Sequence, residues 1–181
     1  MTKVQAFVGI DAGTTGCTVM IFDERGKTLG HGYKEYPVIT PHPGWSEQNL
    51  DVVWNGICGA CSQATANANL PAEAYKSIGL SSQRGTVAML DENKEPLCNS
   101  YVWNCTRAID YQAKFEKEIS PEAHQKLTGM QLSPLWTAAK IAWFRENKPA
   151  LFEKTRWFAN GQEYFLRKLG AEEWVTDPAS L

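Results

Sequence analysis

A stretch that reads DAGTTG and begins at Asp11 combines the groups that phosphate binding requires. The Asp11 carboxylate can hold a divalent cation directly or through water, as Mg²⁺ sites in proteins do. Thr14 and Thr15 add hydroxyl donors. Gly13 and Gly16 allow close approach of the backbone to a ligand, and successive N–H groups in such a turn form an anion-binding concavity. The stretch therefore predicts a site that grips nucleotide phosphates together with Mg²⁺.

Strands must position this turn on both sides. An apolar run over residues 4–10 leads into Asp11, and a second β-rich run covers residues 18–22. The turn DERGK at residues 23–27, with Gly26 at a position suited to positive φ, leads into a third run that reaches residue 36. The pattern predicts three consecutive strands.

The rest of the chain reads as mixed helix and strand. Apolar residues recur at spacings of three and four over residues 50–69, which predicts a helix that Asn49 can cap. Short strands are predicted at residues 75–80, 86–90 and 99–103. From residue 106 the pattern is helical with several breaks; a further helix at residues 163–169 ends at Gly170, and a strand-like segment begins at residues 174–176.

Composition limits the class of protein. The 181 residues suit one domain, and the 43% hydrophobic content can form a core. The formal net charge of −2 gives no basis for nucleic-acid binding or attachment to an anionic membrane, and no apolar run approaches a membrane span. Five irregularly spaced cysteines fit small buried residues in a reducing cytoplasm rather than a zinc or redox site.

Three interpretations of the DAGT sequence compete. It could be a phosphate loop, or the related DTGT of an aspartic protease, in which two such aspartates share a proton. It could also be a hairpin turn without a ligand. An aspartic protease lobe is all-β, whereas about half of this chain reads as helix, and no second Asp-Ser/Thr-Gly is present, although a homodimer could supply one. The protease is therefore disfavoured.

The turn also lacks the Lys-Ser/Thr pair of a Walker loop and opens no helix. It resembles the first phosphate loop of the superfamily of sugar kinases, Hsp70 and actin. Within that group it is most similar to the FGGY carbohydrate kinases, which include glycerol kinase and xylulokinase.

Four later segments resemble the same family in order and spacing. Residues 43–49 (PGWSEQN) resemble Pro-Gly-Trp-x-Glu-x-Asp-Pro, with Asn49 in place of the usual Asp. Residues 82–86 (SQRGT) match the place of Gln-Arg-Glu-Thr in glycerol kinases and Gln-Met-His-Gly in xylulokinases. Residues 102–107 (VWNCTR) resemble Val-Trp-Gln-Asp-Arg-Arg, with Cys105 replacing Asp. Residues 128–143 resemble a Thr-Gly-x-x-x-x-Pro-Tyr-Phe-Ser-x-x-Lys helix.

The resemblance implies an α/β fold of the actin-like, ribonuclease-H-like type. It implies a mixed sheet with helices on both faces, a meander of three antiparallel strands, later strands parallel to the first, and Asp11 at the carboxyl end of the first strand facing a cleft. Residues 1–181 would be the N-terminal domain of the kinase. The catalytic base and most of the adenosine site would lie in a C-terminal domain absent from this chain, and residues 177–181 look like the start of a family segment.

The implied activity is transfer of the γ-phosphoryl group of ATP to a sugar or polyol hydroxyl. Asp11 would be the residue on the metal side, and residues 13–16 would hold the phosphates of ATP with Mg²⁺. The implied partners are ATP and a small sugar or polyol, with a possible homodimer in the full-length protein and a cytoplasmic location. The alternative is a non-catalytic actin-like domain that binds a nucleotide or a partner.

The predicted substrate side is the set Gln83, Arg84, Trp103, Leu135 and Trp136. Arginine can donate several hydrogen bonds to neighbouring hydroxyls, and an aromatic ring can cover the apolar face of a carbon chain. By resemblance to glycerol kinase, Arg84 and Trp103 match positions that contact substrate. Arg84 could instead make a surface salt bridge, and Trp103 could instead pack in the core.

Two departures from glycerol kinase bear on the substrate. Gly85 stands where glycerol kinases have a substrate-binding Glu, and Leu135 stands where they have a substrate-binding Tyr. The lost hydrogen bonds predict that glycerol is a poor substrate and that a ketose or longer polyol fits better. Trp136, Trp143 and Trp157 lie in helical or helix-flanking segments, and most of this group is expected in the core.

Overall fold

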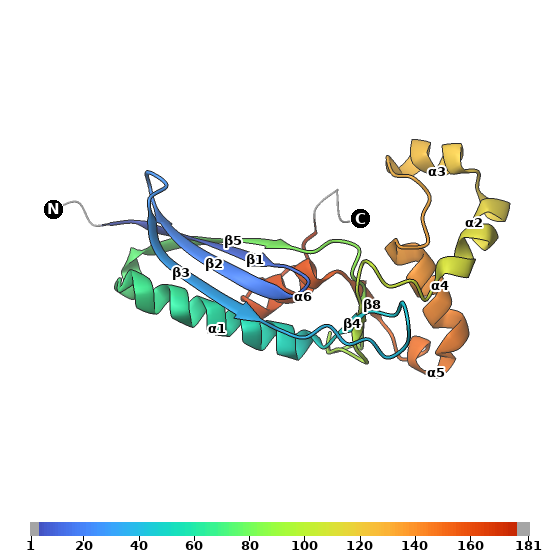
Figure 1. Cartoon of the computed structure of the whole chain (residues 1–181), viewed down its shortest axis with the longest axis horizontal. Helices are drawn as coiled ribbons and strands as arrows, with labels where there is room; N and C mark the ends of the chain where they lie inside the picture. The colour runs from blue at the N-terminus through green and yellow to red at the C-terminus, as the bar shows by residue number, and fades with distance from the viewer. Residues whose placement is uncertain (1–3, 177–181) are drawn as a thin grey trace.

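The computed structural model describes residues 4–176 and centres on a mixed four-stranded sheet. Its strands are β1 (Ala6–Ala12), β2 (Gly16–Asp23), β3 (Thr28–Glu35) and β5 (Tyr75–Ser82), in the order β3-β2-β1-β5. β2 runs antiparallel to both β1 and β3, and β5 runs parallel to β1 (Figure 1). The antiparallel meander and the later parallel strand are confirmed.

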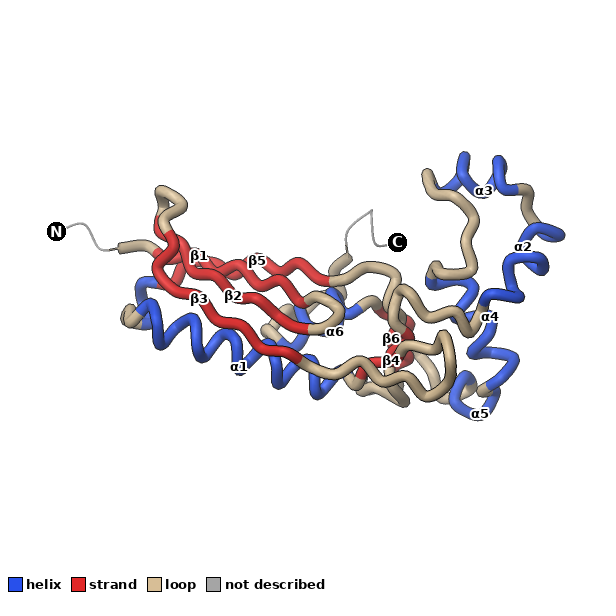
Figure 2. The backbone as a smooth tube through the Cα atoms, in the orientation of Figure 1, coloured by secondary structure: helices blue, strands red, loops and turns tan. Residues whose placement is uncertain are grey.

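Two small sheets and six α-helices complete the described part of the chain (Figure 2). β4 (Glu47–Gln48) pairs with β7 (Ser100–Tyr101), and β6 (Ala88–Leu90) pairs with β8 (Trp157–Ala159). The helices are α1 (Leu50–Ala68), α2 (Gln112–Glu118), α3 (Pro121–Thr128), α4 (Thr137–Asn147), α5 (Pro149–Phe152) and α6 (Gly161–Lys168), with 3₁₀ turns at Ala72–Ala74 and Ile109–Tyr111. The predicted α/β class is confirmed.

Two local predictions need correction, and one short strand was not predicted. The first residue of β8 is Trp157, which was expected in a helical or helix-flanking segment. Residues 174–176 form no strand, and the family-like segment at residues 177–181 lies outside the described residues. The two-residue strand β4 was not predicted, because a strand so short has no periodicity of its own.

The long helix α1 packs against β2 and β3 at very short range. Asn49 begins it as expected, because its side chain accepts hydrogen bonds from the amides of Asp51 at 2.9 Å and Val52 at 3.1 Å. Gly32 on β3 lies so close to the helix that an added Cβ would overlap the carbonyl oxygen of Ala60. Absence of a side chain at this position therefore sets the distance between helix and sheet.

One face of the main sheet forms the larger core. Ala6 and Ile10 of β1 are buried there together with residues of α1 and α6, including Ile57 and Phe165. Among the described residues the opposite face carries no comparable cover, since Phe7 is 36% exposed. Helices were expected on both faces, and within residues 4–176 the helical core lies on one face (Figure 1).

A second core lies beyond the carboxyl end of β1, where α2 to α5 gather (Figure 1). Its buried members include Val87, Tyr101, Trp143 and Phe144. The predicted core position of Trp143 is confirmed, with 8% of its surface exposed. Within residues 4–176 no helix has the combination of length and apolar character that crossing a bilayer demands.

We predict that Gly32→Ala lowers the free energy of unfolding by about 3 kcal/mol, because the new methyl group must push α1 away from β3. Urea unfolding of the protein measures the change. Gly9→Ala is the matched control, since a Cβ there would have no neighbour closer than 3.9 Å. Equal losses in the two variants would contradict the close-packing argument.

Candidate phosphate and sugar site

Asp11 is the next-to-last residue of β1, at the carboxyl end of the strand. It pairs with Thr18 of β2 and with Ser81 of β5, and its side chain is exposed. Alternate residues of a strand point to opposite faces, so Asp11 lies on the face away from the core that contains Ile10. The carboxylate is accessible to a cation from solvent.

The turn that follows, residues 13–16, is held by an internal hydrogen bond and by the side chain of Tyr36. The amide of Gly13 donates to the carbonyl of Gly16 at 3.0 Å. The hydroxyl of buried Tyr36 lies 2.8 Å from the Gly13 carbonyl oxygen and 2.9 Å from that of Gly16. Burial raises the pKa of Tyr36 above its usual value, so its hydroxyl keeps the proton that it donates. We call residues 13–16 the phosphate loop.

Three donors of the phosphate loop remain available. Among residues 4–176 no hydrogen bond is found for the amides of Thr14 and Thr15 or for the hydroxyl of exposed Thr15. These donors lie within four residues of the Asp11 carboxylate. Free N–H and O–H groups beside one exposed carboxylate fit the chemistry of a phosphate with its divalent cation.

The hydroxyl of Thr14 is committed to a closed ring of hydrogen bonds. It donates to Gln83 Oε1 at 2.9 Å, the Gln83 amide group donates to Gln48 Oε1 at 2.5 Å, and the Gln48 amide group donates to the Thr14 carbonyl at 2.5 Å. Gln48 is buried, and its own backbone carbonyl accepts a hydrogen bond from the Ser100 hydroxyl at 3.0 Å. The ring joins the phosphate loop to the predicted substrate side, which contains Gln83.

Trp103 contacts the same threonine. Its indole Nε1 donates to Thr14 Oγ1 at 3.1 Å, and the side chain is 45% exposed. The alternative that Trp103 simply packs in the core is therefore wrong. Trp136 is also 39% exposed, and Trp157 is 40% exposed, so the expectation that these two lie in the core is wrong as well.

Gly85 brings two of the predicted substrate-side residues together. A Cβ built on Gly85 would lie 3.4 Å from the Trp103 Cβ and 3.4 Å from ring carbons of Trp136. The φ of Gly85 is +70°, a left-handed conformation that L side chains rarely adopt. The backbone at position 85 thus favours glycine.

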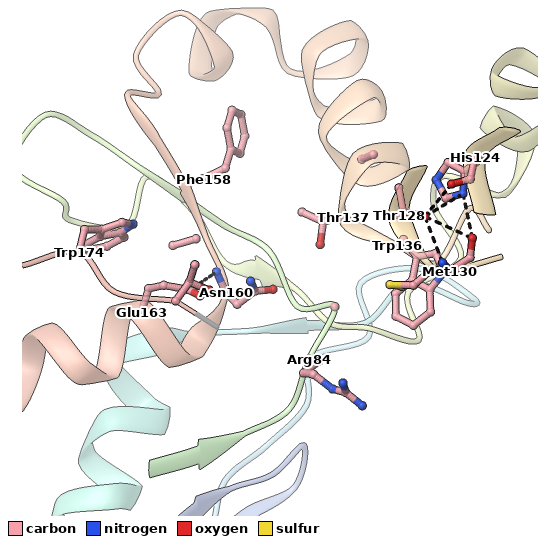
Figure 3. A pocket seen from close by; sticks show the side chains of 14 residues that line it. Arg84, His124, Thr128, Met130, Trp136, Thr137, Phe158, Asn160, Glu163 and Trp174 are labelled. Carbon is pink, nitrogen blue, oxygen red and sulfur yellow. Dashed lines mark hydrogen bonds between the residues drawn. The ribbon is translucent and has the colours of Figure 1, made fainter. Parts of the chain in front are cut away.

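A cavity of about 730 Å³ opens beside Arg84, Gly85 and Trp136. Figure 3 shows Arg84 and Trp136 on one side of it and Glu163 and Trp174 on the other. Among the ion pairs found in residues 4–176, none includes the exposed Arg84, which counts against a surface salt bridge. Of the predicted site residues, only Arg84 and Trp136 line the cavity; Asp11, residues 13–16, Gln83, Trp103 and Leu135 do not.

Arg107 holds the small sheet of β4 and β7 in place. Its guanidinium group lies 2.6 Å from Glu47 and 3.4 Å from the ring centroid of Tyr101, and Trp45 and Trp143 also face it. The Arg107 side chain is 1% exposed. Glu47 precedes Gln48, so this buried ion pair fixes the strand from which Gln48 reaches the phosphate loop.

Sequence reasoning did not assign a role to Gln48, Tyr36 or Lys140. Gln48 lies in a segment that was matched to the family, but a glutamine there gives no sign of its partners. Tyr36 ends the third predicted strand without any distinguishing pattern. Lys140 offered a signal, because Trp143 and Phe144 follow it at spacings of three and four and a lysine on such an apolar face is unusual.

Residues 6–180 match the model of the N-terminal domain of the FGGY family of carbohydrate kinases. This match covers nearly the whole chain and agrees with the sheet and the phosphate loop described above. The chain belongs to the FGGY family, as the motifs predicted.

Glycerol kinases are among the proteins similar to this chain. The glycerol kinase of Halothermothrix orenii is 31% identical over 176 residues, which are 94% of this chain and 35% of the relative; that of Thermococcus kodakarensis is 30% identical over 174 residues, with the same two shares. The chain thus spans about a third of the length of these relatives.

Solved structures of the family share the fold. A xyloylose kinase from Brucella ovis superposes with a TM-score of 0.83 at 28% identity, over 90% of this chain and 34% of that one. The glycerol kinase of Plasmodium falciparum, solved with ADP, gives a TM-score of 0.80 at 23% identity, over 90% and 34%. The second likeness shows the fold alone.

We predict a large stability loss at Thr14 and almost none at the neighbouring Thr15. Thr14→Val leaves Gln83 and the Trp103 indole without their partner and should lower the free energy of unfolding by about 1–3 kcal/mol. Thr15→Val should change it by less than about 0.5 kcal/mol, because its exposed hydroxyl has no partner among residues 4–176. Urea titrations of both variants test this, and a larger loss for Thr15→Val would contradict the ring.

Proposed function

We propose that residues 1–181 are the N-terminal domain of an ATP-dependent sugar or polyol kinase, which transfers the γ-phosphoryl group of ATP to a sugar hydroxyl. The observation that carries this proposal is the meeting of both halves of the site at Thr14, which bonds Gln83 and Trp103 directly. Phosphoryl transfer depends mainly on positioning and charge neutralisation. A loop that carries phosphate donors and is tied to the sugar side meets the first requirement.

Each residue has a distinct task in this proposal. Asp11 would hold Mg²⁺, directly or through water, while the free amides of Thr14 and Thr15 and the Thr15 hydroxyl bind the phosphates of ATP. Gly13 and Gly16 shape the loop. Mg²⁺, when bound, neutralises charge on the phosphates.

The sugar would lie against Arg84, Trp103 and Trp136, with Leu135 in the same segment as Trp136. Gln83 would hold the phosphate loop in place. The exposed Arg84 guanidinium can donate hydrogen bonds to sugar hydroxyls. The cavity of about 730 Å³ beside Arg84 and Gly85 supports a substrate larger than glycerol. Gly85 stands where glycerol kinases have an acidic side chain, and its positive φ agrees with a glycine at this position.

Further parts of the proposal concern the whole protein. The catalytic base and the adenosine pocket would lie in a C-terminal domain, so residues 1–181 alone would be inactive. The full-length protein would be a homodimer. All five cysteines are free thiols, which supports a reducing cytoplasm. The competing function is a non-catalytic actin-like domain that binds a nucleotide or a partner.

An ADP-release assay on the complete protein over a panel of ketoses and polyols separates the two functions. Turnover on a member of the panel supports the kinase. No turnover on any of them, from a folded protein that still binds ATP, supports the non-catalytic domain.

We predict that Asp11→Asn lowers kcat by about 10²-fold or more, because the charge that supports Mg²⁺ is lost. The free energy of unfolding should barely change, since the side chain is exposed. Asp110→Asn, at another exposed position, is the control that should keep full activity. A large loss of stability with little loss of kcat would mean that Asp11 only supports the hairpin.

We predict that Arg84→Ala raises KM for the sugar by about tenfold or more and leaves KM for ATP unchanged, because it removes a charged donor to substrate hydroxyls. Arg145→Ala, an exposed arginine on α4, should change neither constant. Steady-state kinetics on the best ketose or polyol give both values. If glycerol instead gave the highest kcat/KM, the substrate argument from Gly85 and Leu135 would be wrong.

A further inference from the structure

Lys140 is the one lysine among the buried polar residues of the described chain. It lies on the inner face of α4, and none of its surface is exposed. Lysine is almost never fully buried unless its amino group has partners, because removing the charge from water is costly. The partners that justify this cost should therefore reveal what Lys140 does.

The partners are two backbone carbonyls from two separate segments. Lys140 Nζ donates to the carbonyl of Gly85 at 2.8 Å and to the carbonyl of Trp103 at 3.0 Å. Neither ion pair found in residues 4–176 includes Lys140. Its amino group therefore connects the segment that carries Arg84 to the segment that carries Trp103.

Both segments belong to the sugar side of the site. Gly85 directly follows Arg84, and the Trp103 indole is the group that reaches Thr14 of the phosphate loop. Gly85 itself has a left-handed φ of +70°, and the bond from Lys140 holds its carbonyl oxygen. Loss of the amino group would take the donor from the buried Gly85 carbonyl and the part-buried Trp103 carbonyl and free the two segments to separate.

We propose that Lys140 is a positioning residue of the sugar site, which sets the spacing between Arg84 and Trp103 through the carbonyls of Gly85 and Trp103. The proposal rests on the proposed kinase function for its effect on turnover, but its structural effect does not depend on catalysis. A misplacement of catalytic or binding groups by about 1 Å can cost about 10²-fold in rate, so a small movement is enough.

Burial gives Lys140 a second property that agrees with this role. It lowers the pKa of the amino group from its usual value to about 8. The neutral amine still carries two hydrogens, which suffice for the two carbonyls. The connection between the segments can therefore persist whether or not the proton is present.

The test is Lys140→Met in the complete protein, because methionine matches the lysine side chain as far as Cε but has no donor. Lys148→Met, at the exposed end of the same helix, is the matched control. We expect kcat/KM for the sugar to fall by about 10²-fold in Lys140→Met, with KM for ATP within about threefold of the parent protein. The donors for ATP lie on a turn that Tyr36 fixes independently.

Amide hydrogen exchange supplies a readout that needs no turnover. The amides of Val87 and Cys105 close backbone hydrogen bonds beside the two carbonyls, and both should exchange at least about tenfold faster in Lys140→Met. The amide of Gly13 in the phosphate loop should keep its rate. Unchanged exchange at Val87 and Cys105 would overturn the proposal, as would an equal rise at Gly13, which would indicate general loosening.

The two failures are distinguishable. If the parent protein turns over no sugar, the proposed function fails while the exchange rates still decide the role of Lys140. If the parent is active and Lys140→Met keeps the parent kcat/KM, the positioning role is wrong and the kinase function stands.

Discussion

The hydrogen bonds that meet at Thr14 determine how the parts of this domain must fit together. A buried amide without a partner costs about 1–3 kcal/mol, so the buried Gln48 side chain needs its hydrogen bonds to Gln83 and Thr14. These three residues come from the first hairpin, the segment before α1 and the end of β5. The main sheet, the small sheet of β4 and β7 and the substrate side therefore have one mutual arrangement.

The rest of the domain supports this arrangement from outside. Arg107 and Glu47 hold the strand that carries Gln48, while Tyr36 holds the turn that carries Thr14. A buried ion pair is weak evidence for stability, but it is demanding in geometry, and here three aromatic rings surround the guanidinium group. The buried polar groups thus serve specificity of arrangement, while Ile10 and Ile57 in the core supply the driving force.

The sequence predicted those features that one local pattern can encode. Periodicity predicted α1 and the first three strands. Asn49 was predicted as the N-cap of α1, and the positive φ predicted for Gly26 is confirmed at +79°. The two short strands β4 and β8 were not predicted, because they form by pairing with strands distant in sequence and have no periodicity of their own. The hydrogen-bond ring was not predicted for the same reason, since Gln48 and Gln83 are 35 residues apart and become partners only in the folded domain.

The position of β5 has a consequence for handling the protein. β5 is the outermost strand of the main sheet on its side within residues 4–176, and its Ile78 is 55% exposed. An edge strand that presents backbone donors and an apolar side chain is a template for pairing with another chain. Lys76 supplies a charge on this strand, which opposes such pairing. Aggregation of the isolated domain at high concentration would therefore begin at β5, and a second lysine at position 78 is the substitution to improve solubility.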